Sequence, residues 1–382
     1  MVTGSPKRET ILEMPADGSV PGVVVHFHPA HTRTYVSSPS LAILPDGTYV
    51  ASLDHFGPGC YRNETFVHAS SDRGQTWQQI AYMTGQWWST LFEHNGALYL
   101  MGTTTEYGNC VIRRSTDGGH TWTTPDSPAT GLLGQRRYHC NVVPVLKAKG
   151  RLWRGMEDAE AWGNWGEMFR AFVMHADENA DLLNAESWTQ TPPIERNREW
   201  LDGDFGGWLE GNAVLTPEGK IINFLRVASL KRGSEKAAIM HISEDGTDAT
   251  FDPDKDIIDF AGGSKKFVIR FDESTGRYIA LVNDVPNPNP EGRGLAARNT
   301  LSLVSSADLK DWTRHGTLLH NPDDQLHGYQ YVDWQFDGDD LIFLSRTAHG
   351  VGDQAAHNHH DSNYITFHRI PDFRNLLQQE EQ

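Results

Sequence analysis

Six segments of the chain share one pattern of hydrophobic and polar positions. In each, two short runs of mostly apolar residues flank a glycine-containing turn, which is the pattern of two antiparallel strands joined by a tight connection. The predicted hairpins are LAILPDGTYVAS (41–52), LFEHNGALYLMG (91–102), VVPVLKAKGRLWRGM (142–156), AVLTPEGKIINFLRV (213–227), FVIRFDESTGRYIALV (267–282) and VDWQFDGDDLIFLSR (332–346). Apart from the C-terminal tail, no segment has the period of an amphipathic helix, so we expect an almost entirely β structure.

A second repeat lies between these hairpins. SSDRGQTW ends at Trp77 and STDGGHTW ends at Trp122, and both have the form Ser-x-Asp-x-Gly-x-x-Trp. In such a turn the Asp carboxylate can accept backbone N–H bonds, Gly can take a positive φ, and Trp can pack between neighbouring sheets. Weaker copies run from Ser243 to Phe251, from Ser305 to Trp312 and from Asp177 to Trp188.

These two repeats predict an all-β fold, a β-propeller of six four-stranded blades with Asp-box turns, as turns of this Ser-x-Asp form are called. Seven blades remain an alternative. The run VVVHF (23–27) is a candidate for the strand that closes the ring. A length of 382 residues would allow two or three domains, but no linker or low-complexity segment divides the chain. We therefore expect an N-terminal extension (1–22), a single propeller domain (23–375) and a C-terminal tail (376–382).

Composition narrows the classes of partner. The chain has 33 Lys and Arg against 50 Asp and Glu, a formal charge of −17, which argues against nucleic acid. No apolar run reaches the length that spans a bilayer, and three cysteines without metal-type spacing indicate neither a disulfide framework nor a zinc ribbon. We expect a monomer without membrane partners. The segment MVTGSPKRET lacks a signal core, so as written the chain is expected in the cytoplasm, or outside the cell if a signal peptide was removed.

A propeller collects the starts of its first strands and the ends of its second strands on one face, here called the front. On that face we expect His139 beside Tyr138, a pair suited to proton transfer, although a structural histidine is an equal alternative. Glu210 and Arg226 should meet at the channel mouth, as either a structural or a functional pair. Arg346 holds the corresponding position after the sixth hairpin. Two arginines on one face favour a substrate carboxylate, because guanidinium binds it bidentately.

Aromatic and imidazole side chains fill the rest of the predicted front bowl. The segment 349–361 is rich in histidine and could ligate a transition metal, but its spacing matches no helical metal motif, so we expect no metal. No cofactor is required, and a structural calcium ion in the channel is an open alternative. The predicted substrate-binding residues besides Arg346 are Trp88, His327, Tyr329, His357 and His360.

Three stretches resemble a known superfamily. Together with the two Ser-x-Asp turns, SSPSLAILPDGTYVASLDHFGPG (37–59), EGNAVLTPEGKIINFLRV (210–227) and HNHHDSNYITFHRI (357–370) look like the sialidase-like propellers that act on uronate-containing glycans, among them ulvan lyases and rhamnosyl-glucuronate lyases and rhamnosidases. The resemblance spans nearly the whole chain. It implies proton transfer by His139 and His55, with Arg226 neutralising the uronate carboxylate. Glu210 departs from the pattern, because ulvan lyases would have an aromatic acid/base there.

The resulting hypothesis is a carbohydrate-active enzyme that eliminates across C4–C5 of a glucuronate in an acidic oligo- or polysaccharide and releases a terminal sugar such as L-rhamnose. Arg226 and Arg346 would hold the carboxylate. His139, helped by Tyr138, would remove the C5 proton, and His55 or another front group would protonate the leaving oxygen.

Two other functions stay open. One is an exo-glycosidase, a rhamnosidase or a sialidase-like enzyme, with Glu210 and Glu157 as its carboxylate pair. A true sialidase would have an arginine triad, a Tyr nucleophile paired with Glu, and an Arg-Ile-Pro motif near the first blade. The only such tripeptide here is 369–371, near the other end of the chain, which makes sialic acid the weaker guess. The other function is non-catalytic glycan binding, which the fold equally allows.

Overall fold

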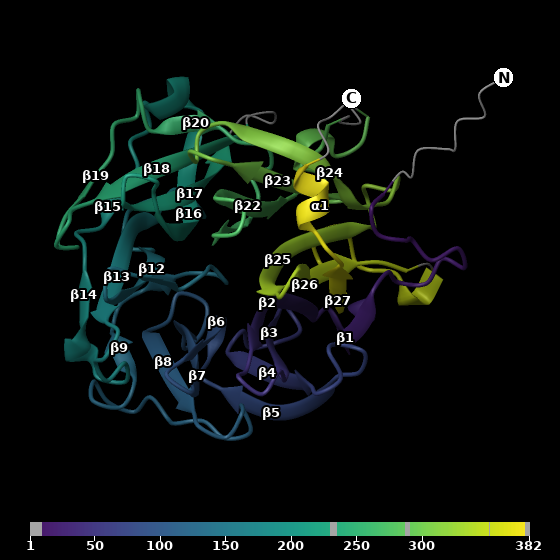
Figure 1. Cartoon of the computed structure of the whole chain (residues 1–382), viewed down its shortest axis with the longest axis horizontal. Coiled ribbons are helices and arrows are strands. Elements are labelled where there is room, and N and C mark those ends of the chain that lie inside the picture. The colour runs from purple at the N-terminus through teal and green to yellow at the C-terminus, as the bar shows by residue number, and fades with distance from the viewer. Residues whose placement is uncertain (1–9, 230–234, 287–290, 351, 379–382) are drawn as a thin grey trace.

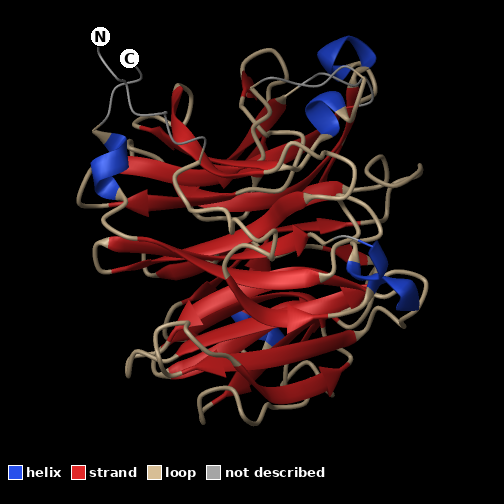
Figure 2. Ribbon diagram, turned by 90° about the vertical axis from the view of Figure 1, so that its right-hand side faces the viewer, coloured by secondary structure: helices blue, strands red, loops and turns tan. Residues whose placement is uncertain are grey.

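Six antiparallel sheets stand around a central axis in the computed structural model, which describes residues 10–229, 235–286, 291–350 and 352–378 (Figure 1). The hairpins predicted from sequence form the inner two strands of each sheet. This confirms the six-bladed, all-β propeller. The view from the side shows that strands make up nearly all of the regular structure (Figure 2). Within the described residues, no helix is long and apolar enough to cross a bilayer.

Each blade has four main strands, which follow one another from the channel outward. Blade 1 contains β2 (Tyr35–Ile43), β3 (Tyr49–Phe56), β4 (Glu64–Ser70) and β5 (Gln78–Thr84). Blade 2 contains β6 (Trp87–His94), β7 (Ala97–Thr103), β8 (Cys110–Ser115) and β9 (Leu132–Gly134). Blade 3 contains β10 (Tyr138–His139), β12 (Arg151–Asp158), β13 (Arg170–Asp177) and β14 (Trp188–Gln190), with the short β11 (Leu146–Ala148) and β15 (Ile194–Glu195) paired to them.

The second half of the ring repeats this order. Blade 4 contains β16 (Phe205–Leu215), β17 (Ile221–Ser229), β18 (Lys236–Ile242) and β19 (Ala249–Thr250), with β20 (Ile257–Asp259) beside β18. Blade 5 contains β21 (Val268–Asp272), β22 (Arg277–Val282), β23 (Thr300–Ser306) and β24 (Trp312–His320). Blade 6 contains β25 (Gly328–Asp337), β26 (Asp340–Ala348), β27 (Tyr364–Ile370) and β1 (Val23–Phe27). The described helical structure is one short helix, α1 (Arg374–Leu377), and a few 3-10 turns.

Blade 6 closes the ring with strands from both ends of the chain. As the sequence predicts, the strand 23–27 is β1, and it pairs antiparallel with β27 as the outermost strand (Figure 1). Of the predicted N-terminal extension, residues 1–9 lie outside the described part. Residues that follow run along blade 5, where the amides of Ile11 and Leu12 donate to the carbonyl oxygens of Thr317 and Leu318. Residues 379–382 of the predicted tail also lie outside the described residues.

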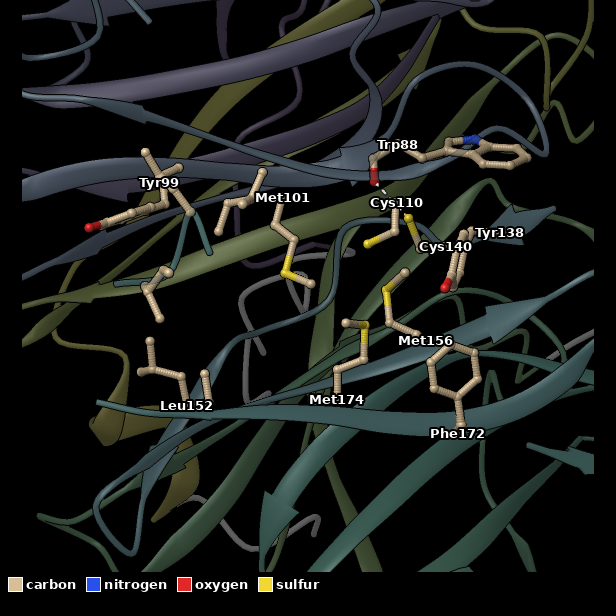
Figure 3. Close-up of a cluster of buried hydrophobic side chains, with 14 of the residues drawn as sticks. Trp88, Tyr99, Met101, Cys110, Tyr138, Cys140, Leu152, Met156, Phe172 and Met174 are labelled. Carbon is tan, nitrogen blue, oxygen red and sulfur yellow. Dashed lines mark hydrogen bonds between the residues drawn. The ribbon is translucent and has the colours of Figure 1, made fainter. Parts of the chain in front are cut away.

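Apolar side chains fill the spaces between neighbouring blades. The cluster between blades 2 and 3 combines Trp, Met, Cys and Leu side chains from β6, β7, β8 and β12, and Figure 3 shows Cys110 and Cys140 at its centre. Both cysteines are fully buried thiols. Sheets packed face to face in this manner put most of the burial between blades, so each blade depends on its two neighbours.

The Ser-x-Asp turns connect the third and fourth strands on the back of the propeller. In blade 1, Asp72 Oδ1 accepts the amide of Thr76 at 2.9 Å and the hydroxyl of Ser70 at 2.8 Å, and Gly74 takes a φ of +88°. Asp117 and Asp245 accept the same kinds of bonds in blades 2 and 4. In blade 5 the serine is Ser306, not Ser305 as the sequence pattern suggested, because Ser305 Oγ faces His315 instead.

Four innermost strands carry a bulge near the front. The ladders of β2, β6, β16 and β25 each shift register, and the bulge contains a non-glycine residue with positive φ. These residues are Ser38 (φ +46°), Trp88 (+50°), Glu210 (+56°) and Tyr331 (+52°). This conformation costs roughly 1–2 kcal/mol for an L-residue, so the surrounding contacts must hold it.

Hydrogen bonds between blades hold these bulges. Two residues after each positive-φ position comes a buried polar side chain that reaches the next blade. Asp333 Oδ2 accepts the amide of Leu41, Ser40 Oγ accepts the amide of Leu91, and Asn212 Oδ1 accepts the amide of Ile269. Thr90 makes the equivalent contact with Val143. The strained backbone is thus part of the seam between blades.

Candidate active site

The front of the channel ends in a cavity of about 210 Å³. Blades 1, 2, 3, 4 and 6 contribute to its wall. The residues that line it are Ser37, Phe56, Arg62, Trp87, Trp88, Glu106, His139, Asn141, Trp165, Glu210, Tyr331, Arg346 and His360. Aromatic rings, imidazoles, guanidinium groups and carboxylates therefore meet in one small space, as expected of a site that both stacks and orients a polar ligand.

The bulges explain why these side chains point into the cavity. A regular strand alternates its side chains between two faces, whereas a bulge places two residues opposite one and re-aims the side chain. Trp88, Glu210 and Tyr331 each occupy the positive-φ position of a bulge and line the cavity. Buried Asp54 supports Trp88, because its Oδ2 accepts the Trp88 amide at 2.7 Å.

Glu210 and Arg226 form a buried ion pair, as the sequence suggested. Arg226 Nη1 donates to Glu210 Oε2 at 2.9 Å, and Asn141 Nδ2 donates to Glu210 Oε1 at 3.0 Å. Burial opposes ionisation of the carboxyl, but the charge and hydrogen bond of Arg226 hold the pKa of Glu210 below its usual value. Glu210 is therefore an ionised carboxylate in the cavity wall at neutral pH.

Three buried guanidinium groups surround Tyr331. Arg346 lies 4.6 Å and Arg298 5.4 Å from the centre of the Tyr331 ring, and the Arg226 guanidinium lies close enough to the Tyr331 phenol to interact with it electrostatically. Within the described residues, neither Arg298 nor Arg346 has a carboxylate at salt-bridge distance, and each keeps a buried N–H without a protein partner, at Nη1 and Nε respectively. Burial lowers the pKa of Arg346 to about 10. This corner of the site carries positive charge in excess of its carboxylates.

His139 is held by a carboxylate behind it. Its Nδ1 lies 3.1 Å from Glu157 Oε2, and its ring stacks on Phe169 with centroids 4.0 Å apart. Glu157 is fully buried, and its other oxygen accepts the amide of Gly211 at 3.3 Å. If Nδ1 donates to Glu157, the lone pair of the neutral ring is on Nε2. A histidine that lines a cavity with this arrangement can accept a proton there.

The structure brings five of the predicted site residues to the cavity: Trp88, His139, Glu210, Arg346 and His360. Arg226 stands directly behind Glu210. The backbone oxygen of His360 accepts a hydrogen bond from Arg346 Nη2 at 2.6 Å, and its Nδ1 lies 2.8 Å from Asp361 Oδ1.

Two predicted tyrosines lie in the core instead. Tyr138 is 3% exposed and points into the cluster between blades 2 and 3 (Figure 3), where burial raises its pKa to about 12. Successive residues of a strand face opposite sides, so Tyr138 cannot share the cavity with His139. Tyr329 is fully buried between blades 5 and 6. Tyr331, two residues later, lines the cavity because the bulge of β25 re-aims its side chain.

Three predicted histidines and Glu157 are also away from the cavity surface. His327 Nδ1 pairs with Asp323 at 3.0 Å, and His357 stacks on Tyr35 with ring centroids 5.3 Å apart. His55 faces β1 and Glu64, and burial lowers its pKa to about 3. Glu157 uses its oxygens on His139 and on the Gly211 amide, so the structure does not offer Glu157 and Glu210 as two carboxylates flanking a sugar.

The sequence patterns missed Tyr331, Arg298 and Asn141. A usable signal was present for the first: in three of the four bulged strands, Thr, Asn or Asp stands inside an apolar run two residues after the side chain that enters the cavity. Arg298 ends a long loop and has no such local pattern. The histidine-rich segment 349–361 does not gather three ligating groups among the described residues.

Comparisons with known proteins agree with this architecture. No family model and no curated protein sequence matches the chain. Among solved structures, an α-L-arabinanase of Penicillium chrysogenum complexed with arabinobiose is similar at a TM-score of 0.56 and 15% identity, over 95% of this chain and 99% of that chain. An α-L-arabinofuranosidase of Fusarium graminearum gives 0.55 and 13%, over 94% and 100%. A sialidase of Trypanosoma rangeli gives 0.53 and 16%, over 98% of this chain and 59% of that one. At these identities the likeness shows the fold alone, which is the β-propeller seen in the sheet topology.

Proposed function

We propose that this protein is a carbohydrate-active enzyme that acts on a terminal sugar bearing a carboxylate. The observation that carries the proposal is the group of three buried arginines, Arg226, Arg298 and Arg346, around Tyr331 at a cavity that also holds Glu210. Burying cations without counter-charges is unfavourable unless a ligand supplies the negative charge. A sugar carboxylate does so and matches the planar guanidinium fork.

The size and lining of the cavity support an exo-acting enzyme. A cavity of about 210 Å³ is smaller than the roughly 300–1,000 Å³ typical of drug-sized ligands, which suits one terminal sugar unit. Trp88, Trp165 and Phe56 provide apolar surface for the faces of the ring. The similar folds whose names describe glycosidases act on arabinose-containing glycans and on sialic acids, which is consistent with a glycan substrate.

Hydrolysis is the reaction we favour. Glu210 is an ionised carboxylate in the wall, and it shares Arg226 with the phenol of Tyr331. A tyrosine acting as nucleophile, with a glutamate as its partner, is an established departure from the usual pair of carboxylates in glycosidases. In this proposal Tyr331 attacks the anomeric carbon and its proton passes to Glu210, while the bond from that carbon to the leaving oxygen breaks and the leaving oxygen takes a proton from solvent. Water then cleaves the bond between the sugar and Tyr331, and Tyr331 regains its proton from Glu210. The arginines fix the sugar carboxylate throughout.

Elimination is the second candidate, and the His139–Glu157 pair favours it. Arginines bound to a uronate carboxylate would acidify the C5 proton. The Nε2 atom of His139 would then act as the base that removes this proton. Without Tyr138 and His55 at the cavity, the group that protonates the leaving oxygen would be Tyr331.

Digestion of a glycan panel tests both reactions. Oligosaccharides ending in sialic acid, in glucuronate or in rhamnosyl-glucuronate, with neutral arabino-oligosaccharides as controls, are incubated with the protein and the products are weighed by mass spectrometry. Hydrolysis adds the mass of water, whereas elimination adds none and leaves an unsaturated product that absorbs in the ultraviolet. Turnover of the neutral panel alone would refute the proposed substrate class, and turnover of nothing would refute catalysis.

Two variants with matched controls then test the groups assigned to each reaction. Tyr331→Phe should abolish hydrolysis, and His139→Gln should abolish elimination. Tyr82→Phe and His241→Gln change exposed side chains away from the cavity, so they serve as controls and should act like the parent protein. If Tyr331→Phe keeps full hydrolytic activity, the tyrosine mechanism is wrong.

A further inference from the structure

Three histidines meet outside the cavity, at the seam where the ring closes. His26 belongs to β1, the outermost strand of blade 6, His28 follows directly after that strand, and His55 lies on β3 of blade 1. Their ligating nitrogens all lie within 4.8 Å of one another. None of these three lines the front cavity. The group therefore lies where blade 6, the last blade of the ring, meets blade 1.

The orientation of His55 matters most. Its Nδ1 lies 3.1 Å from Glu64 Oε1, so the carboxylate accepts a proton from Nδ1 and leaves the lone pair of the neutral ring on Nε2. That Nε2 lies 3.1 Å from Nε2 of His26. A carboxylate behind a histidine whose other nitrogen points at further imidazoles is the arrangement that orients histidine ligands in metal sites.

The surroundings fix the other two rings. The backbone of His28 is held because its amide donates to the carbonyl oxygen of Asn363 at 2.9 Å, and its ring centre lies 4.6 Å from that of His55. Phe66 packs against both His26 and His55, with ring centroids 5.4 and 4.6 Å away. His55 is buried while His26 and His28 are half-buried, so the group is enclosed on one side and reachable from solvent on the other.

We propose that His26, His28 and His55 bind a divalent transition-metal ion of the zinc class. Three imidazole nitrogens are a common donor set for Zn²⁺, and a fourth position would remain for water. The ion would fix β1, the strand that closes blade 6 from the start of the chain, against β3 of blade 1. Glu64 acts as a positioning residue that orients His55.

The competing explanation of the same geometry is a hydrogen bond. His26 Nε2–H would then donate to His55 Nε2, and no metal would be needed. The two explanations differ in what the protein retains. A metal site keeps stoichiometric Zn²⁺ through dialysis, whereas a hydrogen-bonded pair keeps none.

Metal content and competition measure this directly. The purified full chain is stripped with a chelator, loaded with Zn²⁺, dialysed and analysed by elemental mass spectrometry, and its affinity is measured against a chromogenic chelator. We expect one ion per chain and a higher thermal unfolding midpoint with Zn²⁺ than without. Glu64→Gln should lower the affinity about 10- to 100-fold, because the orienting carboxylate is lost. His26→Gln and His55→Gln should lower it further and remove the thermal shift.

His31→Gln is the matched control, since His31 is exposed and close in sequence but outside the group. It should bind Zn²⁺ like the parent. Circular dichroism of each variant without metal shows whether it has folded, and His28→Gln provides a third ligand change if one variant does not fold. Retention of less than about a tenth of an ion per chain, or equal retention by the parent and the His26, His28 and His55 variants, would overturn the proposal.

Discussion

The front and back of this propeller are built from the same six hairpins but differ in how they use them. On the back, the Ser-x-Asp turns repeat one set of local hydrogen bonds from blade to blade, and their aspartates stay ionised because serine, threonine and amide groups donate to them. On the front, five of the six blades contribute different side chains to the cavity, and four inner strands have a strained residue at the bulge near it. On the back, the same local hydrogen bonds recur and stabilise the fold. The front contains buried charges that are unfavourable for stability.

The difference between the two faces is the reason we propose the front end of the channel as the functional end. Buried Arg298 and Arg346 lack carboxylate partners among the described residues, and strained Trp88, Glu210 and Tyr331 all meet at one end of the channel. Natural proteins tolerate such unfavourable groups where a ligand benefits from them. Substitutions matched between the two ends can show whether they differ in this way.

Breaking the buried pair on the front should have the largest effect on stability. Arg226→Met leaves the Glu210 carboxylate buried without its counter-charge, and we expect a loss of about 3–5 kcal/mol in the free energy of unfolding, measured with urea. The double variant Arg226→Met/Glu210→Gln should recover a large part of it. On the back, Arg369→Met removes a partly exposed partner of Asp337 and Asp340 and should cost clearly less. Equal losses at both ends would contradict the comparison.

Removing a front arginine that lacks a carboxylate partner should change affinity and leave stability nearly unaltered. Arg346→Met keeps apolar contact with the rings of Phe56 and Tyr331 but loses the charge. Affinity for an acidic sugar, measured by calorimetry, should fall by about 1.5–3 kcal/mol, roughly 10- to 100-fold. The free energy of unfolding should stay within about 1 kcal/mol of the parent or rise. Arg73→Met, on the exposed back, should alter neither; a large loss of stability in Arg346→Met would show that its role is structural.

Two glycines of the back turns should respond differently to alanine. Gly74 and Gly119 both have positive φ, so either substitution costs roughly 1–2 kcal/mol. A Cβ at Gly74 would lie 2.2 Å from the Phe367 ring, whereas at Gly119 the nearest atom is 3.4 Å away. Gly74→Ala should therefore lose about 1–3 kcal/mol more than Gly119→Ala in urea unfolding. Indistinguishable midpoints would show that the turn absorbs the extra methyl group.

The two faces should also differ in how their stability depends on pH. Burial raises the pKa of Asp54 on the front to about 8, so its contribution to stability declines as the pH rises from about 4, its unfolded value, to about 8. Asp337 on the back is opposed by burial, but bonds from Tyr49, Arg73 and Arg369 lower its pKa to about 2, so its contribution is present above about pH 4 and is lost toward pH 2.

Asparagine at each position isolates these contributions. Relative to the parent, Asp54→Asn should remove a decline in stability between about pH 4 and 8, and Asp337→Asn should remove a loss between about pH 4 and 2, as followed by thermal unfolding across pH. Identical pH profiles for the parent and Asp54→Asn would show that the Asp54 carboxyl is ionised in the folded protein at neutral pH.

The sequence predicted most of the fold, and about half of the predicted site residues lie at the cavity. One physical reason explains both outcomes. Hairpins and Ser-x-Asp turns depend on residues close together in the chain, so their patterns are visible locally, and the closing strand 23–27 was found in the same way. Tyr138 and Tyr329 lie in the core and not at the cavity, because neighbouring strand positions face opposite sides and a bulge changes the alternation without changing the composition. Arg298 approaches Tyr331 only because blade 5 packs against blade 6, a contact that no local pattern describes.

The composite sixth blade has a consequence for how the chain folds and how it can fail. β1 is made first during synthesis, but its partner β27 appears only after nearly the whole chain, so the circle closes late and against a large loss of loop entropy. Between the time β27 forms and the time β1 pairs with it, one edge of β27 has no strand partner. Such an edge can pair with a strand of a neighbouring molecule. A chain that lacks residues 23–27 should therefore associate through β27, so that strand pairing between molecules replaces the pairing of β1 with β27 within one molecule.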